Sequence, residues 1–465
     1  MVKKFFLLAL FPAAFITITQ AQNTLTLKEA VETAVKNYGS IKAKEAYAKS
    51  SQASVEQAKR NALPNINFGL QQDFGTAVGQ NGPLYSFGGL SISSSGSVVT
   101  RQNWNSAFGA LYLTNVNWDF FSFGKAKQQV KVAQSVADRD NNDILQEIFQ
   151  QKIKVAAAYL SLQAAQQLSF SYKRNVDRID TIRRTIITKA LNGLIAGVDS
   201  SSVNADYAGA LISYTNSLDI VQQQENSLAF LMGVDASSLA NVILDSISII
   251  KIPSNLDDSI SLQNNPQLLF YKSRIAVSEQ EKKYIQTQYY PTFSLAGVLQ
   301  TRASGFGNAY AQNLDDYSMS YWNGINPTRT NYLFGIGVTW NITQPYRLSQ
   351  QVKAQNFITK GLQEEYSLTE KQLQAQLQLS QTKWANAIAV YKQVPMQLEA
   401  ANEAYIQRSA LYQNGLATIV DLSQSIFALI QAETDRDIAI SNVWQALLLK
   451  AAATGNFSLF EDELQ

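Results

Sequence analysis

The chain of 465 residues carries one pattern twice, and this duplication constrains its fold more than any other feature. Four landmarks of the first half recur 222 positions later. They are Trp118 and Trp340, Gly193 and Gly415, Asp199 and Asp421, and Gly233 and Gly455. Upstream, Pro64 and Pro291 are 227 positions apart, so the five-residue difference falls in a loop between proline and tryptophan. A repeat of this size is far longer than a solenoid unit and predicts a pseudo-symmetric assembly rather than a single-cleft enzyme.

The N-terminus has the pattern of an export signal. Lys3 and Lys4 precede an apolar stretch, and the small residue Ala21 ends it, so we expect a signal peptide over 1–21 and a mature chain from Gln22. After the signal, no apolar run of about 18 residues could form a transmembrane helix. An exported chain of this kind could enter a membrane only as a closed β-barrel, because lipid tolerates no unpaired backbone groups.

The charge balance and the residue types exclude several functions. Of 38 basic and 36 acidic residues, the signal takes two lysines, which leaves no excess charge to attract nucleic acid. The absence of histidine and cysteine removes Ser/His/Asp and Cys/His catalysis and leaves only carboxylates for zinc. We therefore expect no catalytic residue, no metal site and no cofactor. A hydrolase with a carboxylate pair stays formally open, although no pattern brings two acids into one cleft.

Each half begins with a helix followed by a β-hairpin. A helix over 27–63 should stop at Pro64, where alternation of apolar and polar residues begins. The alternation predicts hairpins at about 65–120 and 292–343, each with a long exposed loop. Strands of about ten residues would suit a membrane; the alternative is a soluble sheet packed on one face. The second loop is rich in aromatic residues that are typical of a membrane boundary. They are Tyr310, Tyr317, Tyr321, Trp322 and Tyr332.

Two very long helices dominate the rest of the chain, over about 125–192 and 348–414. At 1.5 Å per residue each is roughly 100 Å long, so it must pack laterally in coiled-coil fashion, and Pro395 should kink the second. Glycine ends each helix and predicts a tight turn into a return helix. We call residues 192–199 the first tip and residues 414–421 the second tip.

The sequence predicts a mainly α fold with a small β part. Four strands cannot close a barrel, and open edges are forbidden in lipid, so the chain must oligomerise. The expected fold is a long coiled-coil α-barrel plus a transmembrane β-barrel that is completed by oligomerisation, with an internal two-fold repeat. The repeats should span 22–250 and 251–455, and a C-terminal tail should span 456–465.

Several segments together resemble the TolC-like outer-membrane efflux proteins. The strongest is Tyr412-Gln413-Asn414-Gly415 followed by Ala417 to Leu422, supported by Leu25 to Ala30 and by Leu63-Pro64. The resemblance implies a homotrimeric, non-enzymatic channel that contacts outer-membrane lipid and has a large periplasmic part. It implies passive export in a tripartite efflux or type I secretion system, with a periplasmic adaptor and a proton-driven or ABC-type inner-membrane pump. The alternative is a periplasm-spanning structural protein or surface receptor whose coiled coil encloses no conducting lumen.

The resemblance also assigns roles to residues of the two tips. The channel gate would contain Asp421, Gln424, Tyr412 and Asp199. The adaptor-docking residues would be Gly193, Leu194, Gly197, Gly415, Leu416, Ala417 and Thr418. Locally, an aspartate after a turn also caps the next helix. We favour that interpretation for Asp199 and weigh gate and cap equally for Asp421. Gln424 stands where relatives often carry a second aspartate. The loss of that second carboxylate would weaken a cation-binding ring.

Overall fold

The computed structural model describes residues 24–79, 97–240, 242–245, 252–253 and 262–464. The predicted signal peptide lies outside the described residues. The chain divides into two compact units, each drawn from both halves of the sequence. We call them the helical unit (Met1–Glu45, Asn142–Phe270 and Tyr366–Gln465) and the sheet unit (Ala46–Asn141 and Tyr271–Glu365). The mainly helical fold with a small sheet agrees with the predicted class.

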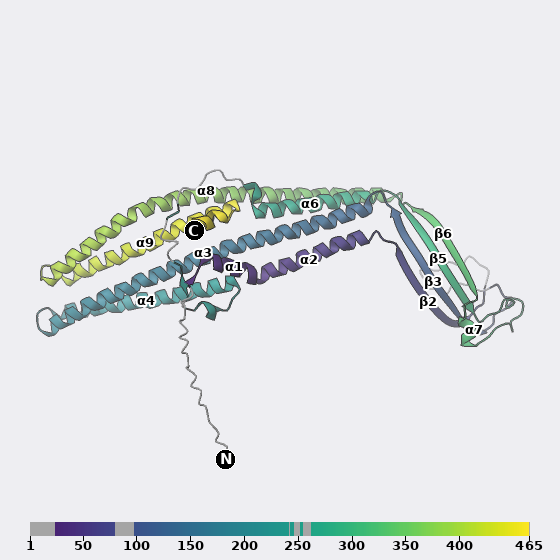
Figure 1. The fold of residues 1–465 in the computed structure, drawn as a ribbon, viewed down its shortest axis with the longest axis horizontal. Coiled ribbons are helices and arrows are strands. Elements are labelled where there is room, and N and C mark those ends of the chain that lie inside the picture. The colour runs from purple at the N-terminus through teal and green to yellow at the C-terminus, as the bar shows by residue number, and fades with distance from the viewer. Residues whose placement is uncertain (1–23, 80–96, 241, 246–251, 254–261, 465) are drawn as a thin grey trace, which may run out of the picture. The chain divides into compact units, whose positions relative to one another are not determined.

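The sheet unit contains both predicted hairpins in one antiparallel sheet (Figure 1). The strand order is β2-β3-β5-β6. The strands are β2 (Asn65–Thr76), β3 (Ser106–Phe121), β5 (Thr292–Ser304) and β6 (Arg329–Thr339). The second hairpin ends earlier than expected, because the Asn341 side chain accepts hydrogen bonds from the backbone N–H and hydroxyl of Thr343, a turn that leads into the next helix.

The two faces of this sheet differ in character. On the apolar face, exposed side chains include Ile66 and Phe68 of β2, and Phe334 and Ile336 of β6. The opposite, polar face presents mainly small and hydrophilic residues. They include Asn65, Asn67 and Gln71 of β2, Asn115 and Asn117 of β3, Ser294 and Gln300 of β5, and Gly335 and Gly337 of β6. The predicted alternation is therefore present in all four strands.

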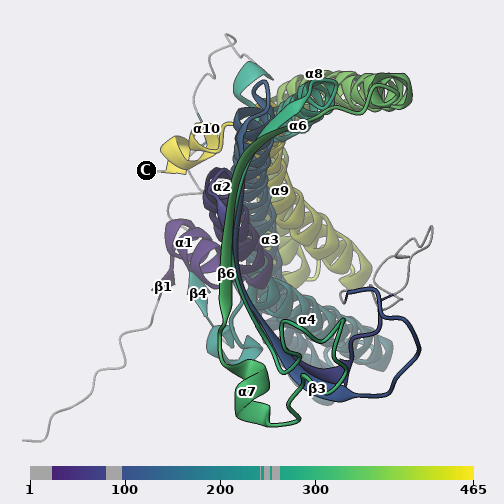
Figure 2. The same cartoon turned by 90° about the vertical axis from the view of Figure 1, so that its right-hand side faces the viewer.

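A short helix that the sequence did not indicate interrupts the second loop. This helix, α7 (Tyr321–Ile325), lies against β3 at the loop end of the sheet (Figure 2). The Tyr112 hydroxyl donates to the Ile325 carbonyl at 3.0 Å, and the rings of Phe108 and Tyr321 meet edge to face at 5.1 Å. Phe108 leaves no room for a Cβ at Gly324. The exposed Trp322 lies on α7, whereas Tyr310 is buried within the loop beside Phe306 and Tyr317.

The first helix is shorter than predicted and divided. Helices α1 (Leu27–Asn37) and α2 (Gly39–Arg60) meet at Tyr38, whose backbone is extended. Thr26 and Glu29 form a capping box at the start of α1. Helix propensity at Asn37 and Gly39 is low, and Asn37 packs against Gly233, so a single helix over 27–63 is wrong.

The long helices agree with the prediction. They are α3 (Lys125–Leu191), α4 (Gly197–Met232), α8 (Gln344–Gln413), which contains Pro395, and α9 (Ile419–Thr454). Helix α6 (Pro266–Thr287) precedes β5. Both return helices end at a glycine in the left-handed region, Gly233 (φ 68°) and Gly455 (φ 77°). In the described part of the chain, no helix combines the length and apolar character needed to cross a membrane.

The core of the helical unit gathers segments from both halves of the chain. Trp444 of α9 and Tyr159 of α3 are buried with residues of α1 and α4. Phe460 of α10 (Ser458–Glu461) meets Trp444 edge to face, so part of the expected C-terminal tail belongs to the core. The short strands β1 (Thr24–Leu25) and β4 (Ile243–Leu244) pair in parallel beside it. The Tyr159 hydroxyl donates to the Leu25 carbonyl at 2.8 Å, and burial raises the pKa of this phenol.

Candidate functional site

The two tips have the same backbone geometry. Gly193 (φ 72°) and Gly415 (φ 74°) adopt the left-handed conformation after α3 and α8. The amide of Leu194 bonds to the carbonyl of Lys189, and the amide of Leu416 bonds to that of Leu411, both at 2.9 Å. The amides of Gly193 and Gly415 also donate, to the carbonyls of Ala190 at 3.0 Å and Tyr412 at 3.1 Å, so both tips are Schellman motifs. Glycine is required at both positions because a side chain there would be strained.

Each tip presents apolar side chains to solvent. Leu194 and Leu416 are 71% and 74% exposed, and Val198 and Val420 are 70% and 67% exposed. A Schellman motif usually buries the residue after the glycine against the preceding turn. Here the leucine stays exposed at both tips, so apolar surface remains available to a partner.

The tips differ in how the return helix begins. At the second tip, Thr418 is the N-cap of α9 and forms a complete capping box with Asp421. At the first tip, Ala196 occupies the N-cap and supplies no side-chain hydrogen bond. Asp199 lies in the first turn of α4 and is not the cap, so the favoured interpretation of Asp199 is wrong. It failed because the cap position holds an alanine.

Asp421 is held in its charged form by this cap. Hydrogen bonds from the Thr418 hydroxyl and backbone N–H lower the pKa of the Asp421 carboxyl below its ordinary value of 3.8. The carboxylate therefore stabilises the fold fully above about pH 4, and this contribution is lost as the pH falls through the lowered pKa. The local geometry supports the capping role of Asp421 and favours the ionised form of its carboxyl.

Tyr412 lies between the two tips. The Lys189 ammonium group is 5.9 Å from its ring centroid and 3.4 Å from the Gln413 carbonyl oxygen. Burial, and then the negative charge of Asp199, raise the pKa of the Tyr412 phenol. Its enclosed hydroxyl has no hydrogen-bond partner among the described residues. The structure thus brings Tyr412 near Asp199 without a direct bond, while Gln424 is exposed on α9 and Gly197 opens α4.

Comparison with known proteins places this arrangement in a familiar context. Residues 259–440 match the sequence profile described as outer membrane efflux protein. The chain carries an outer membrane efflux protein domain. The predicted resemblance is confirmed. The matched segment includes Tyr412, Asp421 and the second tip, whereas the first tip lies outside it. No sequence among the curated proteins matches the chain.

Solved outer membrane channels share the fold. VceC of Vibrio cholerae aligns over 92% of this chain and 96% of its own, with 17% identity and a TM-score of 0.73. CmeC of Campylobacter jejuni aligns over 94% and 89%, with 13% identity and a TM-score of 0.74. MtrE of Neisseria gonorrhoeae, solved in an open state, aligns over 92% and 89%, with 12% identity and a TM-score of 0.67. At these identities the likeness establishes the fold alone, for the efflux protein domain and for the rest of the aligned chain.

Contacts behind the tips join the two helical hairpins. Arg178 of α3 forms a salt bridge with Glu433 of α9 at 3.0 Å and lies over the Tyr405 ring of α8 at 5.5 Å. The Ser423 hydroxyl of α9 donates to Asp206 of α4 at 2.6 Å. Sequence reasoning missed these residues because no local signal pairs positions more than 200 residues apart.

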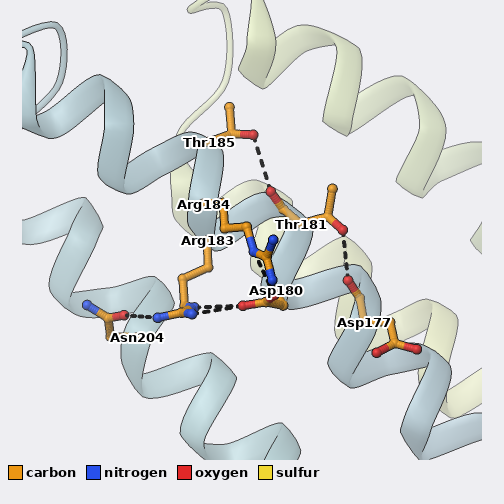
Figure 3. Close-up of polar contacts among 7 residues, drawn as sticks. All are labelled: Asp177, Asp180, Thr181, Arg183, Arg184, Thr185 and Asn204. Carbon is orange, nitrogen blue, oxygen red and sulfur yellow. Dashed lines mark hydrogen bonds and ion pairs between the residues drawn. The ribbon is translucent and has the colours of Figure 1, made fainter.

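A second cluster ties α3 to α4 (Figure 3). Asp180 accepts hydrogen bonds from Arg183 and Arg184, which lower the pKa of its carboxyl. Arg183 also donates to Asn204 at 3.4 Å and lies over the Tyr207 ring at 4.4 Å. The spacing of Asp180 to the two arginines, three and four residues on, was a readable signal for this cluster. The cluster stabilises the first helical hairpin behind its tip.

The asymmetry of the caps leads to a stability prediction. Thr418→Ala should lower the free energy of unfolding by about 1 kcal/mol, the typical cost of a lost N-cap. Ala196→Thr is the matched variant: it recreates a capping box with Asp199 and should raise stability instead. Denaturant unfolding followed by circular dichroism measures both. Equal stability of the Thr418→Ala variant and the original would contradict a working cap at the second tip.

Proposed function

We propose that this chain is the outer-membrane channel of a tripartite efflux or type I secretion system. It gives passive passage to substrates that a periplasmic adaptor and a proton-driven or ABC-type inner-membrane pump deliver. The observation that carries the proposal is the sheet whose one face is apolar and exposed, in a chain with an outer membrane efflux protein domain. In water such an exposed apolar face would promote aggregation, whereas in a membrane it would pack against lipid chains.

The sheet edges support a homotrimer. Strands β2 and β6 are the edge strands, and each pairs on one side only. An open edge carries unpaired N–H and C=O groups, which is forbidden in lipid, so copies of the chain must join edge to edge. Three copies would complete a strand barrel with the polar face toward the lumen, and the long helices would form the periplasmic α-barrel.

Matched hydrogen bonds support the proposed internal repeat over 22–250 and 251–455. The Trp118 indole donates to the Ala62 carbonyl at 2.9 Å, and the Trp340 indole donates to the Tyr289 carbonyl at 3.1 Å. Each acceptor lies two residues before the proline that follows the first helix of its half. The corresponding tryptophan of each hairpin therefore binds the corresponding helix end of its own half.

Roles for the tips follow from their geometry. The exposed leucines and valines of both tips, on turns held by Gly193 and Gly415, form the adaptor-docking surface, with Gly197, Ala417 and Thr418 beside them. Asp421 of each chain forms the acidic ring of the closed entrance, with Gln424 next along α9. Tyr412 and Asp199 lie close enough for electrostatic coupling and would help to hold the entrance shut. The relatives with this fold are described as channels, which supports a role without catalysis.

Conductance of the purified complex tests this function. The complex should have the mass of three chains in mild detergent and should insert into planar lipid bilayers to give discrete channel openings. A structural protein or surface receptor without a lumen would give the same mass and no conductance. Trimers that never conduct, across a range of voltages and pH, would therefore reject the channel and favour the structural alternative.

A further inference from the structure

Two arginines stand opposite each other at the loop end of the sheet. In the register of β5 and β6, Arg302 pairs with Arg329. The same row continues through Leu111 of β3 to Gln71 of β2. Because side chains alternate along a strand, this row lies on the polar face, opposite the face that carries Phe334 and Ile336.

Neither arginine has an acidic partner in the described part of the chain. Both side chains are exposed. Arg329 donates to the Asn308 side-chain oxygen at 2.7 Å. With the Gln300 amide oriented for hydrogen bonding, its oxygen accepts from Arg302. No carboxylate of the described residues lies within 4.0 Å of either guanidinium group. Their partners are neutral amides, which leave the positive charge uncompensated.

Such a pair is costly for the sheet alone. Like charges directly opposite each other in a β-ladder repel and lower stability. The neighbouring row on the same face, Gln300 opposite Asn331, is neutral, so the repulsion is confined to one row at the strand ends. The register places the two arginines directly opposite each other on one face. Each guanidinium group can donate two hydrogen bonds to the oxygens of a phosphate or sulfate group.

We propose that Arg302 and Arg329 form an anion-attracting ring at the outer mouth of the channel, which takes soluble multivalent oxyanions. The inference rests on the proposed function, because the ring requires three chains around one lumen. Two arginines from each of three chains place six guanidinium groups in the ring. Asp73 lies on the same face at the end of β2, so three carboxylates offset part of this charge and leave the ring positive. Lipid phosphates would contact the other face of the sheet.

Pyrophosphate block of single channels in planar bilayers tests the ring. Pyrophosphate on the loop side should reduce current through the original channel. The double variant Arg302→Gln/Arg329→Gln should need a pyrophosphate concentration at least about tenfold higher for the same block. A cleft that focuses charge raises the local concentration of the opposite ion by at least about this factor. It should also shift the reversal potential in a KCl gradient toward cations. Arg347→Gln, beyond the other end of the sheet, is the matched control, and pyrophosphate should block this variant as it blocks the original channel.

The outcomes separate the ring from the channel itself. Equal block of the original and the double variant, with conductance intact, overturns the ring alone. Block of the original channel by pyrophosphate from the helix side at the same concentration also overturns it, and this measurement needs no variant. If the block depends on the charge of the lipid headgroups and not on the soluble anion, the arginines bind lipid, and the proposed ring is overturned as well. Absence of any conductance rejects the proposed function and the ring with it.

Discussion

Replacing both exposed tip leucines with glutamate, as Leu194→Glu/Leu416→Glu, should abolish export and leave the trimer in the membrane. The two side chains are about three-quarters exposed, so the fold loses few contacts when they change. In a docked complex, however, each glutamate would place an unpaired charge in an apolar contact. Loss of a central interface residue costs about 2 kcal/mol or more, roughly thirtyfold in affinity, and here two such sites change in every chain.

The experiment needs a variant that keeps the apolar surface. Leu194→Met/Leu416→Met conserves side-chain volume and should export like the original. Substitution of Gly193 or Gly415 is less informative, because their positive φ would strain the turn and confuse misfolding with lost docking. Export by cells is compared with adaptor binding to purified trimers. Unchanged export in the glutamate variant would show that the adaptor docks elsewhere.

Asp421→Asn should remove most of the cation preference of the closed entrance. In the proposed trimer three carboxylates would converge on the axis, where they would attract cations and coordinate a blocking divalent ion. In the single chain, the hydrogen bonds from Thr418 lower the pKa of the Asp421 carboxyl, which favours its charged form at neutral pH. With Gln424 in place of a second acid, neutralising Asp421 leaves the proposed ring without charge. Single-channel reversal potentials and divalent block measure the effect.

A second variant separates the gate from the helix cap. Thr418→Ala breaks the capping box and keeps the carboxylate, whereas Asp421→Asn removes the charge. If Asp421 gates, selectivity changes in Asp421→Asn and stays the same in Thr418→Ala, although both lose helix stability. If Asp421 only caps, both variants lose stability and neither changes selectivity. A selectivity change in Thr418→Ala alone would indicate that the backbone position of the tip, not the charge, controls the entrance.

Local chemistry made much of this fold readable in advance. Gly193 and Gly415 predicted the tight turns because only glycine adopts their positive φ without strain. Alternation along β5 and β6 predicted which residues share a face. The capping box was equally local: Thr418 and Asp421 have the required spacing, and Ala196 shows why Asp199 has no equivalent. Asp199 does not cap α4 because Ala196, three positions earlier, occupies the N-cap.

The sequence by itself determined the elements whose physics is local: long helices between glycine stops, strands with one apolar face, and an export pattern without histidine or cysteine chemistry. The tertiary structure alone decided what depends on distant partners. It divided the first helix where Asn37 meets Gly233, placed α7 against Phe108, and joined Arg178 to Glu433. It also set Arg302 opposite Arg329, since strand register depends on how two strands align across a long loop.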